Sequence, residues 1–320
     1  MFTEVRKYYV GIDLGGTFIK GGVVDDNGNI IVEDKIPTET EKGEEVVLDN
    51  IATLINLVLS KAGLSKSEIE GIGMGVPGMI DSKTGTVIFS NNFGWNDVKI
   101  SAGIYKRIGV SVEISNDANA AALGEAIFGA GRNFDNMILL TLGTGVGGGI
   151  VVDNKLIEGN KSAGAELGHA VIVANGEQCT CGRKGCLEAY SSATALIRDT
   201  KRAMEEHKDS KMWEIGSLDK VTGKTAFDYK EVDIYAKAVV DNYIEMLALG
   251  ITNYANIFRP NAVVLGGGVC AQGDNLIKPL QKIVDREIFA GEAGPKCEVR
   301  IATLGNSAGI LGAVALVMNK

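Results

Sequence analysis

A glycine-rich turn between two apolar, strand-like runs occurs twice in this sequence, and this repeat constrains the fold more than any other feature. Residues 9–14 lead into Gly15-Gly16-Thr17 and then into a second apolar run. Residues 137–142 lead in the same way into Gly143-Thr144-Gly145. The two copies begin about 130 residues apart, which is far longer than the period of a solenoid. The sequence therefore predicts an internal duplication of domain-sized halves.

Strand and helix patterns alternate along the rest of the chain, as in an α/β protein. The predicted elements are a helix over 45–62, strands over 69–76 and 110–114, a helix from Asn116-Asp117 to Phe128, helices over 191–207 and 232–258, a strand over 262–265 and a docking helix over 308–318. Residues 209–231 are polar and irregular and fit no regular element.

Length and charge narrow the classes of function. A chain of 320 residues suggests two domains, each with its own core. The net charge is −8, lysine and arginine form no dense stripe, and no apolar run reaches the roughly 18 residues of a membrane span. We therefore expect no nucleic-acid or membrane partner. No secretory signal precedes the first strand, so the expected location is cytoplasmic.

The glycine clusters indicate close backbone approach to a ligand. A third cluster, Gly266-Gly267-Gly268, follows the predicted strand 262–265, at the strand end where open α/β sheets place ligands. Convergent backbone N–H groups suit phosphate oxygens, which favours a nucleoside triphosphate, although no P-loop or Rossmann fingerprint occurs. One cluster alone would more simply be a tight turn, whereas three in duplicated positions favour the nucleotide.

Two charged residues flank the first turn. Asp13 stands just before it and is suited to hold the hydration shell of Mg²⁺. Lys20 follows the turn, and its ammonium suits either a phosphate or plain solvent on an exposed strand.

Four potential zinc ligands lie within one short segment. They are His169, Cys179, Cys181 and Cys186. Three thiolates and one imidazole complete a tetrahedral site and leave no position for a reactive water, so the metal would be structural. The alternatives are a disulfide or free thiols, and the odd total of five cysteines disfavours a disulfide framework. Two carboxylates, Glu166 and Glu188, flank the segment and are left for another task.

Asn116-Asp117 stands at the predicted start of a helix, and two interpretations are open. Capping alone would select such residues, because their side chains accept from the first free N–H groups of a helix. A charged carboxylate is also adequate as the base in phosphoryl transfer, because the accepting hydroxyl becomes acidic late in a loose transition state.

Five motifs together resemble the ROK family of repressors, open reading frames and sugar kinases, and among its members the bacterial glucokinases. The motifs lie at residues 13–17, 116–119, 142–147, 166–169 and 179–188. The resemblance covers essentially the whole chain. It implies an α/β fold of the duplicated actin-like, hexokinase-like (ribonuclease H-like) type, whose two domains are separated by a cleft and close over sugar and ATP. It further implies a small domain of residues 1–116 plus about 305–320 and a large domain of residues 117–304 that carries the zinc-binding segment 166–188.

The resemblance also implies a role for individual residues. Asp117 would be the general base that takes the proton from the 6-hydroxyl of the sugar. The implied sugar contacts are Gly78, Asn91, Asn116, Asp117, Glu166, His169 and Glu188. The implied contacts to the phosphates and adenosine of ATP are Gly15, Gly16, Thr17, Thr144, Gly145, Gly267 and Gly268, which join Asp13 and Lys20 in the expected nucleotide site. The structural zinc of the family maps onto His169, Cys179, Cys181 and Cys186, so His169 would bind zinc with one ring nitrogen and sugar with the other.

Glucose is the substrate that the overall resemblance favours, including the run of residues 91–96. Mannose, fructose, N-acetylmannosamine and N-acetylglucosamine are alternatives, because the same carboxylate acceptors suit their hydroxyls. A sugar-sensing protein without catalysis is the second class, and the presence of Asp13 and Asp117 argues against it. Family repressors carry a helix-turn-helix module ahead of the sugar-binding part, for which a first strand at Tyr8 leaves no room. We expect a homodimer or homotetramer.

Overall fold

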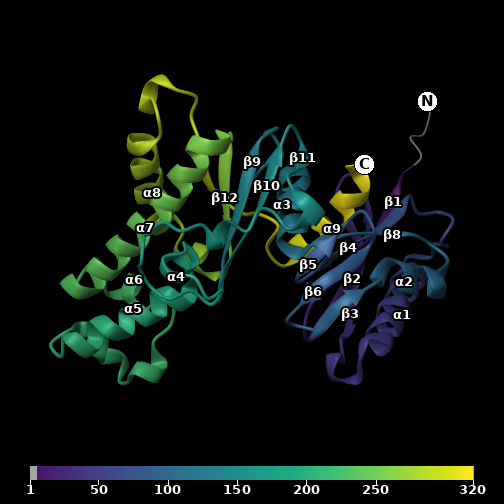
Figure 1. The fold of residues 1–320 in the computed structure, drawn as a ribbon, viewed down its shortest axis with the longest axis horizontal. Coiled ribbons are helices and arrows are strands. Elements are labelled where there is room, and N and C mark those ends of the chain that lie inside the picture. The colour runs from purple at the N-terminus through teal and green to yellow at the C-terminus, as the bar shows by residue number, and fades with distance from the viewer. Residues whose placement is uncertain (1–5, 320) are drawn as a thin grey trace. The chain divides into compact units, whose positions relative to one another are not determined.

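The chain divides into two compact units (Figure 1). The structure is a computed structural model, and it describes residues 6–319. The first unit contains the chain up to Asp135, Gly149–Ala165 and the run from Thr303 onward, and the second contains Asn136–Gly148 and Glu166–Ala302.

Two five-stranded sheets have the same strand order, which confirms the predicted duplication. The first runs β3-β2-β1-β4-β8 and the second β11-β10-β9-β12-β13. In the first, β1 pairs antiparallel with β2 and parallel with β4; in the second, β12 pairs parallel with β9 and with β13. The strands of the first sheet are β1 (Tyr8–Leu14), β2 (Phe18–Asp25), β3 (Ile30–Pro37), β4 (Gly71–Val76) and β8 (Val112–Asn116). Those of the second are β9 (Met137–Leu142), β10 (Val146–Val152), β11 (Lys155–Leu156), β12 (Ala262–Gly266) and β13 (Glu298–Ile301).

Helices cover both faces of the first sheet. Helix α1 (Glu44–Ala62) buries a stripe of apolar residues against β2 and β3 and ends at Gly63, whose φ of 69° is left-handed. Helix α2 (Ile100–Ile108) packs beside α1. Helix α9 (Ala308–Met318), the predicted docking helix, packs against β1 and β4. Since side chains alternate across a strand, Ile12 joins the core under α1 while Tyr9 joins the core under α9.

Glycine in the strands allows α9 to approach the sheet closely. A Cβ at Gly73 would lie 1.8 Å from the carbonyl oxygen of Ala313, and one at Gly11 would lie 2.2 Å from that of Ile310. On the other side of α9, a Cβ at Gly124 of α3 (Asp117–Phe128) would lie 2.8 Å from the Gly312 backbone. Many of the glycines in this chain therefore serve backbone packing as well as turns.

Helix α3 packs against α9, so residues up to Asp135 belong to the first unit. Gly149–Ala165 also belong to the first unit, so the change of unit falls within β10. The domains expected from the sequence, 1–116 plus about 305–320 and 117–304, stay a prediction.

The second unit carries five α-helices among the described residues. They are α4 (Glu188–Ser191), α5 (Ala193–Glu206), α6 (Thr225–Tyr229), α7 (Ile234–Phe258) and α8 (Asp274–Glu287). Residues 209–231, for which the sequence predicted no regular element, contain two 3₁₀ turns and α6. Asp233, the N-cap of α7, fixes the start of this segment because its carboxylate accepts from the Ser210 hydroxyl at 2.6 Å and the Lys211 N–H at 2.5 Å.

A small three-stranded sheet in the first unit was not predicted. It consists of β5 (Met79–Asp81), β6 (Thr86–Ser90) and β7 (Trp95–Val98) in that order. The rings of Phe93 and Trp95 stack at 4.7 Å between centroids and close the turn between β6 and β7. Within residues 6–319, no helix combines the length and the apolar character that a membrane span requires.

Candidate functional site

The carboxylate of Asp13 lies against the first turn of α9. A Cβ at Gly309 would stand 2.4 Å from Cγ of Asp13, so only glycine leaves room for the carboxylate there. Lys20, its cross-strand partner on β2, places Nζ 3.8 Å from Oδ2. Burial raises the pKa of Asp13, and the positive charge of Lys20 opposes this rise without cancelling it. A second cation close to Asp13 would therefore stabilise the ionised form.

Hydrogen bonds from its own backbone and from Thr38, the residue that follows β3, fix the first glycine turn. The N–H of Gly15 donates to the Phe18 carbonyl at 3.1 Å, and the hydroxyl of Thr38 donates to the Gly15 carbonyl at 2.6 Å. A Cβ at Gly15 would lie 2.7 Å from the Phe18 oxygen, whereas one at Gly16 would meet no atom within 4 Å. Gly16 and Thr17 are exposed. Gly15 therefore shapes the turn, while the backbone around Gly16 is open to a ligand.

The start of α3 places the side chains of Asn116 and Asp117 beside the first free N–H groups of the helix. Asn116 is the N-cap: its Oδ1 accepts from the N–H groups of Ala118 and Asn119 at 2.9 and 3.3 Å. Its Nδ2 donates to the Gly78 carbonyl at 3.0 Å, which brings together two residues that the sequence analysis named separately. Asp117 follows as the first residue of the helix, and its carboxylate is exposed. Oδ1 of Asp117 also accepts from the Ala118 N–H, at 3.0 Å, so Asp117 takes part in the helix start and is at the same time accessible to a ligand.

Gly78 immediately precedes the small sheet, and Asn91 follows its second strand, β6. Gly78 has a φ of 129°, and a Cβ there would lie 2.4 Å from the Phe89 carbonyl oxygen, so the position requires glycine. Asn91 lies in the exposed turn between β6 and β7. Gly78 is therefore joined to the Asn116-Asp117 pair by a hydrogen bond, whereas Asn91 belongs to a separate turn.

The predicted zinc ligands of the second unit come together. One ligand atom from each of His169, Cys179, Cys181 and Cys186 lies within 4.8 Å of every other. Sγ of Cys181 and Sγ of Cys186 are 3.7 Å apart, and Sγ of Cys179 is 3.6 Å from Nδ1 of His169.

These distances fit a tetrahedral zinc ion. Zn–S bonds of about 2.3 Å and Zn–N bonds of about 2.0–2.1 Å place neighbouring ligand atoms about 3.8 Å apart for S and S and about 3.6 Å apart for S and N. A disulfide, with sulfurs about 2.05 Å apart, does not fit the 3.7 Å separation of Cys181 and Cys186. Because Nδ1 of His169 faces the sulfurs, Nε2 is the ring nitrogen left for another partner.

The run before the cluster is packed tightly against the second glycine turn. A Cβ at Gly168 would lie 2.0 Å from the Val146 carbonyl oxygen. The hydroxyl of Tyr254 on α7 donates to the Leu167 carbonyl. Glu166, which precedes this anchored pair, is exposed. The backbone is therefore fixed while the carboxylate of Glu166 is accessible.

Glu188 joins the zinc-ligand segment to the second glycine turn. Its Oε2 accepts from the Val146 N–H at 3.0 Å, and its Oε1 accepts from the Thr180 hydroxyl at 2.6 Å. A Cβ at Gly145 would lie 2.4 Å from Oε2. Burial raises the pKa of Glu188, but the hydrogen bonds from Thr180 and Val146 outweigh it, so the pKa lies below its ordinary value. The contributions of Thr180 and Val146 were not predicted, since nothing in their sequence neighbourhood links them to Glu188.

The third glycine cluster borders a cavity of the second unit. Gly267 has a φ of 95°, and a Cβ there would lie 2.4 Å from the Leu142 carbonyl oxygen. Gly268 lines a cavity of about 700 Å³, within the range of small-molecule sites. The other lining residues are Ala193, Thr222, Gly223, Lys224, Asp228, Val269, Ala271 and Gln272.

The β9–β10 turn is tied to the wall of this cavity. The N–H of Ala193 donates to the Gly143 carbonyl at 2.8 Å, and the Thr194 hydroxyl donates to the Thr144 carbonyl at 2.8 Å. Residues 222–224 and Asp228, for which the sequence predicted no role, form part of the same wall. Their composition is that of an ordinary polar loop, so the sequence carried no signal for this placement.

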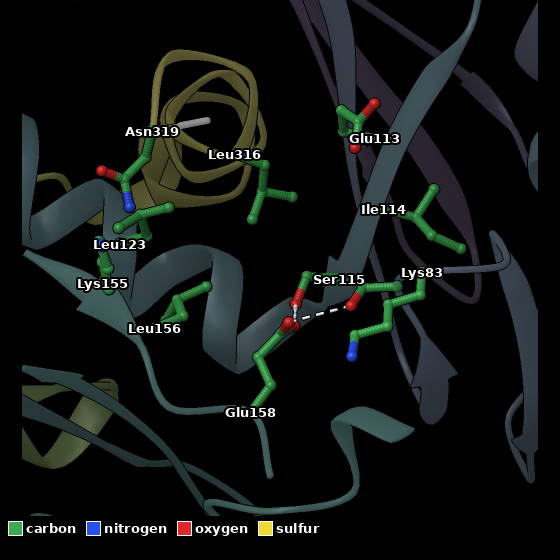
Figure 2. Close-up of a pocket in the computed structure, with 11 residues that line it drawn as sticks. Lys83, Glu113, Ile114, Ser115, Leu123, Lys155, Leu156, Glu158, Leu316 and Asn319 are labelled. Carbon is green, nitrogen blue, oxygen red and sulfur yellow. Dashed lines mark hydrogen bonds between the residues drawn. The ribbon is translucent and has the colours of Figure 1, made fainter. Parts of the chain in front are cut away.

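Another cavity, of about 380 Å³, lies in the first unit and contains none of the predicted site residues. Figure 2 shows Glu158 reaching toward Ser115 among its lining side chains. The Glu158 carboxylate accepts from the hydroxyls of Ser115 and Ser82 at 2.7 and 3.0 Å. Ser82 also contacts the hydroxyl of Ser162 at 2.8 Å. These bonds anchor the loop that leads to Glu166.

Comparison with known proteins finds relatives that match this chain over nearly its full length. The profile of the ROK family matches residues 9–320. The glucokinase of Halalkalibacterium halodurans is 39% identical over 318 residues, which cover 97% of this chain and 95% of that protein. The structure of a ROK family glucokinase from Streptomyces griseus in complex with glucose and AMPPNP has a TM-score of 0.78 at 34% identity and covers 98% of this chain and 100% of that one.

A second solved structure supports the same architecture. The ROK hexokinase from Thermus thermophilus has a TM-score of 0.82 at 32% identity, with 97% of each chain covered. The matching order of the two sheets is thus the duplicated actin-like, hexokinase-like fold that the sequence predicted. On its sequence and on its fold, this chain belongs to the ROK family.

Proposed function

We propose that this chain is an ATP-dependent glucokinase, which converts ATP and D-glucose into ADP and glucose 6-phosphate. The observation that carries the proposal is the full-length likeness to glucokinases, one of them solved with glucose and AMPPNP. The start of α3 supports it, because Asn116 is the N-cap and the adjacent Asp117, the first helical residue, is exposed.

Asp117 is the proposed general base. The sugar 6-oxygen forms a bond to the γ-phosphorus while the bond from that phosphorus to the β–γ bridging oxygen breaks, and the hydroxyl proton passes to the Asp117 carboxylate. In a loose transition state the proton leaves late, so an exposed, ionised carboxylate is basic enough. Catalysis then depends on positioning, which the N-terminal turn of α3 supplies because the first helical residue has a fixed backbone.

The proposed sugar contacts use acceptors and fixed donors. Glu166 and Glu188 would accept from sugar hydroxyls, and Nε2 of His169 would be a donor if zinc occupies Nδ1. In the first unit, Asn116, Asp117 and the neighbouring Gly78 would contact the sugar, with Asn91 from the turn between β6 and β7. A site that matches each hydroxyl rejects analogues that leave a buried acceptor unpaired.

The proposed nucleotide contacts are backbone groups and one carboxylate. Gly15-Gly16-Thr17 and Thr144-Gly145 would face the phosphates, and the cavity beside Gly267 and Gly268 would hold the adenosine. Mg²⁺ bound with ATP would neutralise phosphate charge. Asp13 would bind its hydration shell, and this second cation would favour the ionised carboxylate that burial disfavours. Lys20 would add a further positive charge beside Asp13.

A structural zinc ion is the proposed occupant of the His169 and cysteine cluster. Its ligands would be Nδ1 of His169 and the thiolates of Cys179, Cys181 and Cys186, whose spacing fits a tetrahedral ion. All four positions would be taken by protein, so the ion stabilises the segment and takes no part in phosphoryl transfer.

A coupled assay with ATP and Mg²⁺ across a panel of hexoses tests the proposal. We expect glucose to give the highest kcat/KM. A higher value for mannose, fructose, N-acetylmannosamine or N-acetylglucosamine would change the substrate but keep the reaction. Glucose binding without ADP formation would instead indicate a sugar-sensing protein. Size-exclusion chromatography with light scattering tests the expected homodimer or homotetramer.

A further inference from the structure

The two oxygens of the Glu188 carboxylate have different partners, and both belong to the second unit. Oε2 accepts from the backbone N–H of Val146 at 3.0 Å. Oε1 accepts from the hydroxyl of Thr180 at 2.6 Å, and Sγ of Cys179 lies 3.5 Å from the same oxygen. Neither fixed donor is a charged group.

In the proposed zinc site Cys179 is a thiolate and has no proton to donate, which leaves one donor on each oxygen of Glu188. Such a carboxylate cannot rotate without losing a hydrogen bond. It has about four lone-pair positions, so two stay available to hydroxyl donors. The Val146 N–H is part of the strand backbone and holds Oε2 whatever the side chains are. The hydroxyl of Thr180 is the only one of the two donors that a substitution can remove.

Thr180 stands between two of the proposed zinc ligands, in a loop whose backbone is closed by hydrogen bonds. The Gly182 N–H donates to the Cys179 carbonyl at 3.1 Å, and the Cys179 N–H donates to the Arg183 carbonyl at 2.9 Å. The position of the Thr180 hydroxyl therefore follows from the fold of this loop. Whatever orders the loop also sets the orientation of Oε1.

We propose that Thr180 is a positioning residue for the sugar, which orients Glu188 and thereby couples the zinc-ligand loop to sugar affinity. This inference rests on the proposed function, in which Glu188 accepts from a glucose hydroxyl. It adds a residue that binds neither the metal nor the sugar and that acts through the Oε1 contact. Its effect is on binding, since the reacting 6-hydroxyl is assigned to Asp117.

The competing explanation is that Thr180 only stabilises its loop. In that case removal of the hydroxyl lowers zinc content or melting temperature, and any change in sugar affinity follows from these. A positioning role changes sugar affinity while zinc content and melting temperature stay at their wild-type values.

The test compares Thr180→Val, which keeps the shape and removes the hydroxyl, with Thr180→Ser, which keeps the hydroxyl. Thr84→Val, in the exposed turn between β5 and β6, is the matched control. For Thr180→Val we expect the glucose KM and the calorimetric glucose Kd to rise about three- to tenfold, as for an exposed hydrogen bond, with kcat within about twofold. Thr180→Ser and Thr84→Val should match the wild type.

Deoxy analogues of glucose identify the hydroxyl concerned. The analogue that lacks the hydroxyl held by Glu188 should bind wild type and Thr180→Val equally, while the other analogues keep the difference. Equal glucose affinity of Thr180→Val and wild type, or loss of zinc from Thr180→Val, would overturn the inference. A wild-type protein that binds no hexose would overturn the proposed function itself, and the inference with it.

Discussion

The β1–β2 turn of the first unit and the β9–β10 turn of the second share a backbone design but differ in charge. In each, the N–H of the first glycine donates to a carbonyl of the same turn, from Gly15 to Phe18 at 3.1 Å and from Gly143 to Gly145 at 3.0 Å. The first turn is preceded by the Asp13 carboxylate, whereas the aligned position before the second turn is Thr141. The second turn instead contacts the carboxylate of Glu188.

The two carboxylates are shifted in opposite directions. Burial raises the pKa of Asp13, with Lys20 as partial compensation. At Glu188 burial is outweighed by hydrogen bonds from Thr180 and Val146, and the pKa is lowered. Asp13 thus gains from an added cation, while Glu188 is already stabilised as an anion and offers fixed lone pairs to neutral hydroxyls. In the proposed function both turns face the phosphates, but the carboxylate beside the first turn serves Mg²⁺ and the carboxylate beside the second turn serves the sugar.

The largest expected effect is that of substituting Asp117, which should greatly slow phosphoryl transfer while glucose binding is retained. Asp117→Asn keeps the size and removes the base, so kcat should fall about 10²–10⁴-fold. The glucose Kd should change by less than about threefold, because recognition is assigned mainly to other groups. Steady-state kinetics and calorimetry measure the two quantities, and Asp26→Asn in an exposed turn is the control. Retention of kcat in Asp117→Asn would remove this residue from the reaction.

Loss of a proposed zinc ligand should weaken glucose binding without affecting Asp117, the proposed general base. Cys181→Ala removes one of four ligands, so zinc content should fall and the glucose KM should rise about tenfold or more, while any remaining turnover still depends on Asp117. Metal analysis and kinetics on the same preparation provide the readout. Cys297→Ala, at a buried cysteine remote in sequence from the cluster, should keep its zinc. A zinc-free, folded Cys181→Ala with wild-type glucose affinity would show that the metal has no role in the sugar site.

Replacing one glycine by alanine in each turn compares the two turns directly. A Cβ at Gly145 would stand 2.4 Å from Oε2 of Glu188, whereas one at Gly16 would meet no atom within 4 Å. Neither glycine has a left-handed φ, so the contrast is steric. Gly145→Ala should raise the glucose KM about tenfold by displacing Glu188. Gly16→Ala should leave the glucose KM unchanged and raise the KM for ATP by a smaller factor. Equal effects of both variants on glucose would contradict the division between the turns.

Sequence patterns identified the features that local chemistry determines. Asn116 was recognisable because helix starts select such side chains. The four proposed zinc ligands lie within 18 residues of one another in the chain, so their clustering suggested a site. The duplication was visible because both turns need the same glycines.

The features that the sequence did not reveal depend on contacts between distant segments. The small sheet uses strands of three to five residues, too short to show a clear alternation. Helix α3 packs on α9, and no pattern within residues 117–135 predicts that contact. Residues 222–224 and Asp228 line the cavity beside Gly268 because the chain around α6 folds there, not because of their composition. Helix α8, by contrast, was open to prediction, because Leu276, Leu280 and Val284 recur at helical spacing in the sequence.

The smallest expected effect is a change in stability at Asp13. Its pKa in the folded protein is raised from 3.8, so the folded state holds this proton more tightly than the unfolded state does. The stabilisation is complete below about pH 3.8 and is lost as the pH rises through the folded pKa. At pH 7, without Mg²⁺ and ATP, the buried charge therefore destabilises the protein. Asp13→Asn should raise Tm by about 2–4 °C there, and the gain should shrink as the pH is lowered toward 4.

Calorimetric melting curves of wild type and Asp13→Asn, with and without Mg²⁺ and ATP, measure this effect. The ligands should raise the Tm of the wild type more than that of the variant, because only the wild type has a carboxylate for the added cation to neutralise. The same substitution should reduce activity, so stability and function are opposed at this position. A lower Tm for Asp13→Asn at pH 7 would mean that Lys20 and the N-terminus of α9 already stabilise the carboxylate fully. The first turn would then resemble the second, and the contrast between Asp13 and Glu188 would disappear.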